Sequence, residues 1–440
     1  MLKKLLALVL FTILFQTINA QNEFITIWKP GSSQQINFPG RGTNFNVYWE
    51  EVGYPQHNGS LTDVTSTLEF TVNFGAPLNP SPANATYRIK ISNGNGNFDR
   101  VRFFDGMLIP GYTNADRTKI IDVAQWGSIQ WKSFEDAFVF CTNLDVSAPD
   151  TPDLSFVTSM KQMFYLCFSL VGNPSFNTWD TSTVTTMFYM FGETSFNQPL
   201  GNWNTSNVTD MSFMFDYATQ FNQPIGSWNT SKVTAMEHTF HGAMAFNQDL
   251  RNWDTSKVTV MEEMFHEANS FNQNIGSWSL AALTQAQKMF LNSGLNCQNY
   301  DNTLYGWSIN AATPNNINLA SVAPLVYAAP FAVNARNNLI SKGWIISGDT
   351  YNNQCSSQLS TIEVSDGNGI SVYPNPAKDV IYVKNADNAE RYMILDASGR
   401  ILTLRTMTGN SIDIRFLNPG NYMLQIITKE KTQNFKFIKK

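Results

Sequence analysis

The sequence of 440 residues predicts a multidomain protein in which an α/β solenoid of about 25-residue repeats lies between an N-terminal β-sandwich and a small C-terminal antiparallel β-sandwich. One pattern recurs in the middle of the chain, with copies beginning at Phe196, Phe221, Phe246 and Phe271. A fixed period in this range indicates units that bury their apolar faces only against one another. Both flanks instead carry short alternating apolar runs bounded by Gly, Pro and Asn, which are typical of antiparallel strands.

Large apolar side chains hold the same places in every copy and are predicted to form the core. Strict recurrence favours core packing over a cofactor or glycan site, because a ligand site uses a few positions once. Two diverged copies that end at Cys141 and Cys167 extend the array to residues 126–300, and residues 301–355 are expected to cap it. The predicted core residues are Phe196, Phe221, Phe246, Phe271, Trp179, Trp203, Trp228, Trp253, Trp278, Met187, Met211, Met236 and Met261.

Each copy also predicts its own local structure. The V-T-x-M segment alternates with period two and predicts a short strand, and the following x-x-M-F-x-x-A has room for one helical or 3₁₀ turn. An Asn recurs one residue after the opening Phe, so its amides are expected to form a ladder along the stack. These residues are Asn197, Asn222, Asn247 and Asn272.

The repeated letters resemble a known family. The M-x-x-M-F, F-N-Q-P-I and W-N-T-S-x-V-T patterns are similar to the BspA-like class of bacterial surface leucine-rich-repeat proteins, in the branch first noted in mycoplasma surface proteins. Residues 299–309 and 335–349 resemble the cap that follows those repeats. The resemblance implies a leucine-rich-repeat-like fold in an exported protein that makes surface contacts, with no catalytic site in the repeats.

The N-terminus has the features of a secretory signal peptide over residues 1–20. Lys3 and Lys4 precede an apolar run, and cleavage is expected before Gln21. The alternative, a retained anchor helix, is disfavoured because nothing after Ala20 continues the apolar segment. No transmembrane segment is expected after cleavage.

The C-terminal segment, residues 371–440, follows a polar linker at 356–370 and reads as short alternating strands. Its Y-P-N-P motif and terminal lysines closely resemble the C-terminal sorting domain of type IX secretion substrates. That resemblance implies the type IX secretion machinery as a partner, and a mature protein that is released or attached to the outer membrane at the cell surface of a didermic bacterium. The motif residues are Tyr373, Pro374, Asn375, Pro376, Lys439 and Lys440.

Residues 21–125 carry β-type runs and predict a sandwich of immunoglobulin-like or PKD-like topology. Charge separates the body from the tail: residues 371–440 carry a net charge of +5, whereas residues 21–370 carry −12. An acidic body disfavours phosphate-backbone partners, which require clustered Lys and Arg. Nucleic acid is therefore not expected as a partner.

The four cysteines suit an exported chain in which disulfides persist. Cys141 and Cys167 hold the same place in successive copies, so they are either a disulfide between neighbours or two buried free thiols. Cys297 and Cys355 bracket the cap, and a bridge between them would close it.

A search for catalytic and cofactor motifs is negative, so the chain is expected to be no enzyme and to need no cofactor. His241 and His266 share a column with Asp216, which allows a metal site, but solvent-facing polar residues are the preferred interpretation and no metal is predicted. A weak calcium patch at Glu237, Glu262 and Glu263 is likewise disfavoured, because the D-x-[DN]-x-[DN]-G signature is missing. Tryptophans outside the register could stack on sugars; these are Trp28, Trp49 and Trp131.

These observations predict a non-catalytic, exported or cell-surface protein that mediates adhesion to an extracellular protein or glycan. The alternative is a carbohydrate-binding accessory protein of a secreted polysaccharide-degrading system. A structural role in an external matrix stays open.

Overall fold

The computed structural model describes residues 22–103, 116–353, 371–374, 376–384, 389–396, 401–428 and 432–440. The chain divides into two compact units, Met1–Cys355 and Ser356–Lys440. The predicted signal peptide and the predicted linker at 356–370 lie outside the described residues.

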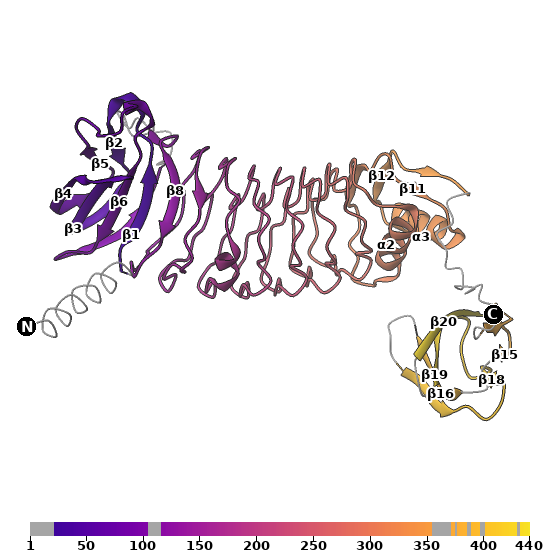
Figure 1. The fold of residues 1–440 in the computed structure, drawn as a ribbon. Coiled ribbons are helices and arrows are strands. Elements are labelled where there is room, and N and C mark those ends of the chain that lie inside the picture. Colours follow the sequence, from indigo (N-terminus) through magenta and orange to yellow (C-terminus); the bar gives the residue numbers. More distant parts are fainter. Residues whose placement is uncertain are drawn as a thin grey trace, which may run out of the picture. The chain divides into compact units, whose positions relative to one another are not determined.

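The first unit opens with a seven-stranded sheet (Figure 1). The strands pair in the order β4-β3-β6-β1-β8-β9, and β7 also pairs with β3; all pairs are antiparallel except β8–β9. A separate two-stranded sheet consists of β2 and β5. The strands are β1 (Phe24–Trp28), β2 (Gln35–Phe38), β3 (Gly40–Glu51), β4 (Tyr54–Ser66), β5 (Phe70–Asn73), β6 (Tyr87–Ser92), β7 (Asn97–Val101), β8 (Ile120–Gln125) and β9 (Asp145–Val146), with short 3₁₀ turns at η1 (Gly31–Ser33) and η2 (Pro82–Asn84).

The core of this sheet continues into the repeats without a break. Alternate residues of β6 are buried, as the period-two pattern requires. The ring of Trp126 lies 5.5 Å from that of Trp179, and Phe103 lies 6.2 Å from Phe138. Because β9 also joins the sheet from within the repeats, the sheet and the array share one hydrophobic core.

The predicted leucine-rich-repeat-like α/β solenoid is wrong. The described residues contain two α-helices, α2 (Cys297–Ile309) and α3 (Pro330–Ser341), and both follow the copies. Between β9 and α2 the described copies consist of turns and isolated bridges, with one 3₁₀ turn, η5 (Pro174–Thr178). The fold is multidomain and β-rich, with its strands in several small sheets.

The physical reason lies in the backbone of the predicted strand and turn. The V-T-x-M segment contributes only one parallel bridge per copy, in the series Ser159, Thr186, Asp210, Ala235, Val260 and Gln285. After it, two residues four positions apart have positive φ in each copy, as at Phe213 (59°) and Tyr217 (50°), which breaks both helix and strand geometry.

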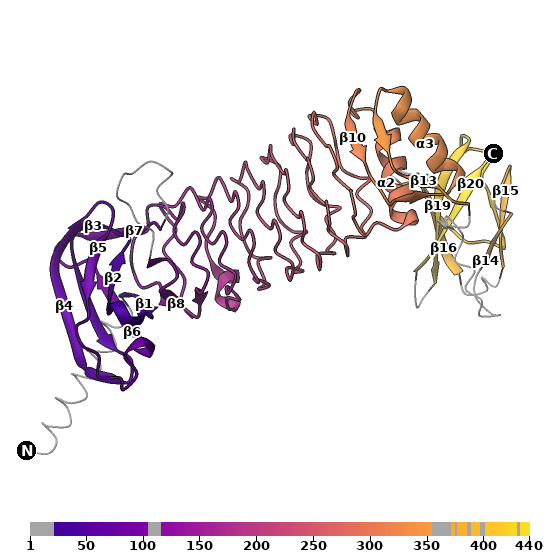
Figure 2. The same ribbon diagram turned by 90° about the horizontal axis from the view of Figure 1, so that it is seen from above.

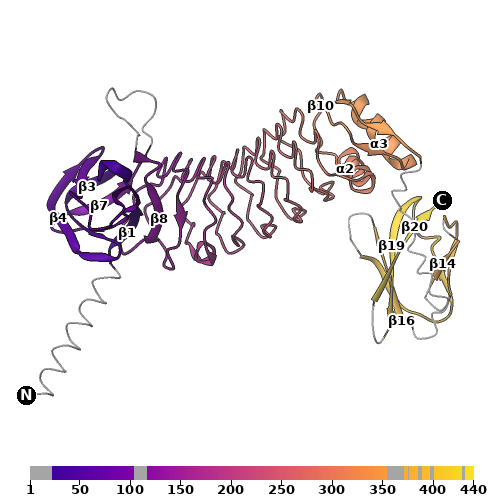
Figure 3. The same cartoon turned by 45° about the horizontal axis from the view of Figure 1, so that its top comes forward.

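Hydrogen bonds to the next copy accompany this unusual backbone. Met211, Phe213, Phe215 and Tyr217 donate their N–H groups to carbonyls of the following copy at 2.7–3.1 Å. Left-handed non-glycine residues cost of the order of 1 kcal/mol each, so they persist only where such bonds compensate. Figures 2 and 3 show the copies as a row of similar loops.

The row ends in the segment that carries α2 and α3. Asn296 caps α2 by accepting a hydrogen bond from the N–H of Asn299, and Pro330 occupies the first turn of α3, where no N–H is needed. Two parallel strand pairs complete the segment: β10 (Asn318–Ser321) with β12 (Ile345–Ser347), and β11 (Val326–Tyr327) with β13 (Thr350–Tyr351).

The second unit consists of two antiparallel sheets around one small core. One sheet has the order β14-β15-β18, formed by β14 (Ser371–Tyr373), β15 (Val380–Lys384) and β18 (Ser411–Asp413). The other has the order β17-β16-β19-β20, formed by β16 (Ala389–Asp396), β17 (Ile401–Thr406), β19 (Gly420–Thr428) and β20 (Thr432–Lys439).

Candidate functional site

The apolar columns of the repeats lie inside the array. The five tryptophans at the recurring position are 1–4% exposed, and the Met and Phe residues of the predicted core are fully buried. Successive indoles stack, with centroids of Trp203 and Trp228 6.2 Å apart and the planes 4° from parallel. These columns therefore do not face a ligand.

Four of these five indoles also donate a hydrogen bond to the preceding copy, a contact that the repeat pattern did not predict. Nε1 of Trp228 donates to the carbonyl of Leu200 at 2.9 Å, and Trp203, Trp253 and Trp278 make the equivalent bond. No residue type marks this bond in the sequence, because its acceptor is a backbone carbonyl.

The predicted Asn ladder is present at the edge of the copies. The side-chain oxygen of Asn222 accepts a hydrogen bond from the backbone N–H of Asn247 at 3.0 Å and one from Gln248 Nε2 at 2.8 Å. The same pattern links Asn197 to Asn222, and Asn247 to Asn272. Backbone and Gln donors of the next copy thus satisfy these side-chain oxygens, which therefore serve the stack.

A second, partly exposed set of rings runs over five copies, and we name it the ring face. It comes from the segment with the positive φ angles, where the residue types differ between copies and therefore produced no repeat signal. Its residues are Tyr165, Phe188, Tyr189, Phe213, Tyr217, His238, His241 and His266.

The rings of this face touch one another from copy to copy. Tyr189 lies 4.5 Å from Tyr165 and stacks on Phe213 at 4.3 Å, and Phe213 stacks on His238 at 4.4 Å. Burial raises the pKa of Tyr189, and the charge of Asp216 adds to this, so the phenol stays neutral. The face thus begins as an aromatic strip.

At its other end the ring face consists of histidines. His241 stacks on His266 at 4.8 Å, and its Nδ1 lies 2.8 Å from Asp216. The predicted column of Asp216, His241 and His266 is therefore brought together. His238 and Glu263 also approach this column, a neighbourhood that the repeat pattern did not predict for these two residues.

The three acidic residues considered as a calcium patch do not share one environment. Glu237 has a raised pKa because of burial, with contributions from the charges of Glu262 and Asp210. Glu263 instead faces His238, His266 and Lys288.

The tryptophans considered for sugar stacking are not available for it. Trp28 and Trp131 are fully buried and Trp49 is 8% exposed, so this prediction is wrong. Trp28 and Trp49 occupy buried positions of β1 and β3, and the ring of Trp131, which lies after β8, packs against Phe24 at 4.9 Å.

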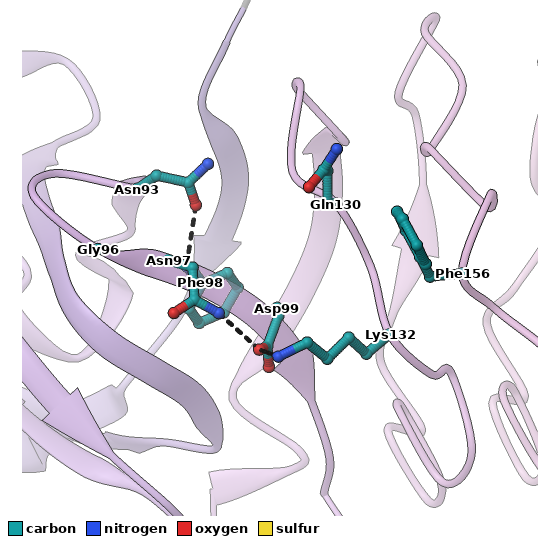
Figure 4. A pocket seen from close by; sticks show the side chains of 8 residues that line it. All are labelled: Asn93, Gly96, Asn97, Phe98, Asp99, Gln130, Lys132 and Phe156. Atoms are coloured by element: carbon teal, nitrogen blue, oxygen red, sulfur yellow. Dashed lines mark hydrogen bonds and ion pairs between the residues drawn. The ribbon is translucent and has the colours of Figure 1, made fainter.

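A pocket of about 570 Å³ lies where β7 meets the first copies (Figure 4). Asp99 is paired with Lys132, and Asn97 Nδ2 donates to Asp99 at 2.7 Å. Phe156, 60% exposed, presents a free ring on the repeat side. The lining residues are Asn93, Gly96, Asn97, Phe98, Asp99, Gln130, Lys132 and Phe156.

Cys141 and Cys167 are buried free thiols in the structure, which is the second of the two alternatives from the sequence. Sγ of Cys167 donates to the carbonyl of Phe138 at 3.0 Å. Cys297 is disulfide-bonded, and Cys355 lies outside the described residues.

The landmarks of the second unit come together at one place. The N–H of Ala377, next to Pro376, donates to Ile438, and the N–H of Lys440 donates to the carbonyl of Ala377 at 2.9 Å. Lys439 is 8% exposed, whereas Tyr373 is 52% exposed and stacks on Tyr382. Pro374 follows Tyr373 directly, and Asn375 lies outside the described residues.

These features define a β-rich repeat protein with a separate C-terminal unit. Residues 132–233 and 223–321 match the family described as Mycoplasma protein of unknown function, DUF285, to which the BspA-like resemblance pointed. Residues 371–440 match the secretion system C-terminal sorting domain. No curated protein matches the chain.

The sorting domain indicates a protein that is secreted or attached to the outer surface of a bacterium, with the type IX machinery as a partner. Within the described residues, no helix has both the length and the apolar character needed to cross a membrane.

Proposed function

We propose that the protein is a non-catalytic interaction protein of the bacterial surface, in which the ring face contacts an extracellular partner. The observation that carries this proposal is the unbroken run of partly exposed rings across successive copies. Tyr217, for example, is 39% exposed beside the buried core. Aromatic side chains held rigidly at a surface supply large contact area at low entropic cost, and they are enriched at the centres of interfaces.

The C-terminal sorting domain supports the location of this activity. Deleting residues 371–440 from the full chain and fractionating cells tests the route. We expect the truncated protein in the periplasm and the complete chain in the medium or on the surface. Equal surface display of the two would contradict the proposal.

The contact itself is tested with the mature protein against a panel of purified extracellular proteins and a glycan array. Tyr217→Ser is expected to weaken a saturable contact by about 30-fold, the effect of removing a hot-spot ring. The matched control is Ile309→Ser, because Ile309 is also exposed but lies at the end of α2. Equal losses in both variants would count against the ring face.

A second candidate function, carbohydrate binding in a polysaccharide-degrading system, is favoured by the pocket at β7. Its amides and the exposed ring of Phe156 are groups that bind sugars. Phe156→Ala should abolish glycan binding if this function holds and leave protein contacts intact. Glycan binding unaffected by this change would exclude the pocket.

A further inference from the structure

Three of the four histidines in the chain lie at one end of the ring face. One ligand atom from each of His238, His241 and Glu263 lies within 4.8 Å of the others. We propose that these three side chains bind one divalent transition-metal ion of the Zn²⁺ class, which joins two successive copies.

The geometry of the group suits such an ion. His238 and His241 lie three residues apart in one copy, and Glu263 lies in the next. Nε2 of His238 is 3.4 Å from Oε2 of Glu263. Tetrahedral Zn²⁺ with ligands at about 2.0–2.1 Å places neighbouring ligand atoms about 3.4 Å apart, so this pair already has the required separation. Side-chain rotation closes the remaining, wider gaps.

The side chains around the group orient its ligands. Nδ1 of His241 lies 2.8 Å from Asp216, and this hydrogen bond leaves Nε2 as the free ring atom. A carboxylate on the second nitrogen is the usual support for a histidine that binds zinc. Glu263 is similarly held, by Nδ1 of His266 at 2.8 Å and by Nζ of Lys288 at 3.0 Å.

The charge states of the ligands are also suitable. Burial raises the pKa of Glu263, but hydrogen bonds from His266 and Lys288 outweigh it and leave the pKa at about 2, so the carboxylate is ionised. Burial lowers the pKa of His238, which favours the neutral imidazole. Among the described residues, Nδ1 of His238 has no hydrogen-bond partner although it is buried.

Donor chemistry selects the class of metal. Two imidazoles and one carboxylate suit Zn²⁺ and its first-row neighbours, whereas Ca²⁺ and Mg²⁺ take oxygen ligands. The four side chains at the site, including His266, are 13–23% exposed, so an ion can enter from solvent. Three protein ligands leave a fourth position to water.

The test titrates metal-free mature protein with Zn²⁺ and, separately, with Ca²⁺ by calorimetry. We expect one saturable Zn²⁺ per chain and no Ca²⁺ binding at this site. His241→Gln and Glu263→Gln should each abolish Zn²⁺ binding. Asp216→Asn should weaken Zn²⁺ binding by about 10–100-fold, because Asp216 supports a ligand and does not contact the ion. Far-UV circular dichroism checks that each variant folds.

Matched controls separate this site from other groups. Glu262→Gln removes the neighbouring carboxylate, and His57→Gln removes the one histidine elsewhere in the chain; both should retain full Zn²⁺ binding. Co²⁺ should give a tetrahedral d–d spectrum without a thiolate band, which excludes Cys141 and Cys167 as ligands. Absence of one-to-one binding in the wild type, or undiminished binding in Glu263→Gln, would overturn the proposal.

Discussion

Replacing Trp228 tests how much of the array depends on contacts between copies. Its indole is 3% exposed and lies between Trp203 and Trp253 at 6.2 and 6.4 Å, with all planes within 6° of parallel. Its Nε1 donates to the carbonyl of Leu200 in the preceding copy. One side chain thus contacts the copies on both sides.

The loss of folding stability expected for variants of Trp228 follows from these contacts. Truncation of a buried Trp to Ala costs about 3–5 kcal/mol. Trp228→Phe keeps a ring in the stack but loses the hydrogen bond, and the carbonyl of Leu200 still accepts from the N–H of Trp203. The loss specific to the bond is therefore a net contribution of about 1 kcal/mol, without the penalty of an unpaired buried carbonyl.

Trp179 supplies the matched control. It is 2% exposed and stacks on Trp203 at 6.3 Å, but its Nε1 has no partner among the described residues. Trp179→Phe therefore removes a similar ring area and no bond. Trp228→Phe should be less stable than Trp179→Phe by about 1 kcal/mol.

Urea unfolding of the mature protein, followed by far-UV circular dichroism, measures both effects. With an m-value of about 3 kcal/mol/M, Trp228→Ala should lower the midpoint by about 1–1.7 M, and the two Phe variants should differ by about 0.3 M. Hydrogen exchange should show the loss of protection in the copies on both sides of Trp228. If Trp228→Ala left the midpoint unchanged, the indole would not join the copies and the reasoning would fail.

Three further predictions concern other parts of the first unit. Asn222→Ala should lower the free energy of unfolding by about 0.5–1.5 kcal/mol, because the N–H of Asn247 loses its acceptor. Asn222→Asp keeps an acceptor and should lower it less, and thermal melting compares the two variants. Burial raises the pKa of Glu51, but hydrogen bonds from two backbone N–H groups and an imidazole outweigh this effect and hold the pKa below 4.5. The stabilisation from Glu51 is therefore present above that pH and is lost as pH falls through the folded pKa. Glu51→Gln should flatten the acid limb of the stability–pH curve, and an unchanged limb would refute this. Burial raises the pKa of the thiols of Cys141 and Cys167, so a thiol reagent should modify neither in the native protein and both after unfolding, and rapid native labelling would contradict their burial.

The interior of the array could be predicted from sequence because recurrence reports burial directly. Trp228 and Met236 stand at fixed intervals, and a side chain that must fit the same gap in every copy varies little. The ring face could not be found this way. Phe213, His238 and Glu263 hold one column in successive copies but differ in chemistry, so no repeat marks them.

The solenoid prediction failed for a related reason. The side-chain period of the V-T-x-M-x-x-M-F segment fits a strand and then a turn, whereas the backbone has positive φ at two positions per copy and donates hydrogen bonds to the next copy. Local propensity disfavours such dihedrals at Phe213 and Tyr217. Only hydrogen bonds to the carbonyls of a neighbouring copy make these dihedrals favourable. No local sequence pattern reports where those carbonyls lie.

The sequence by itself determined the 25-residue period, the buried columns, and the C-terminal sorting segment at 371–440. These features depend on residue type and spacing alone, which can be read without knowing how neighbouring copies pack. Only the tertiary structure decided that the N-terminal sheet shares its core with the repeats, and that His238, His241 and Glu263 converge. Convergence depends on the rise from one copy to the next and on the direction of each side chain, and both follow from packing between copies.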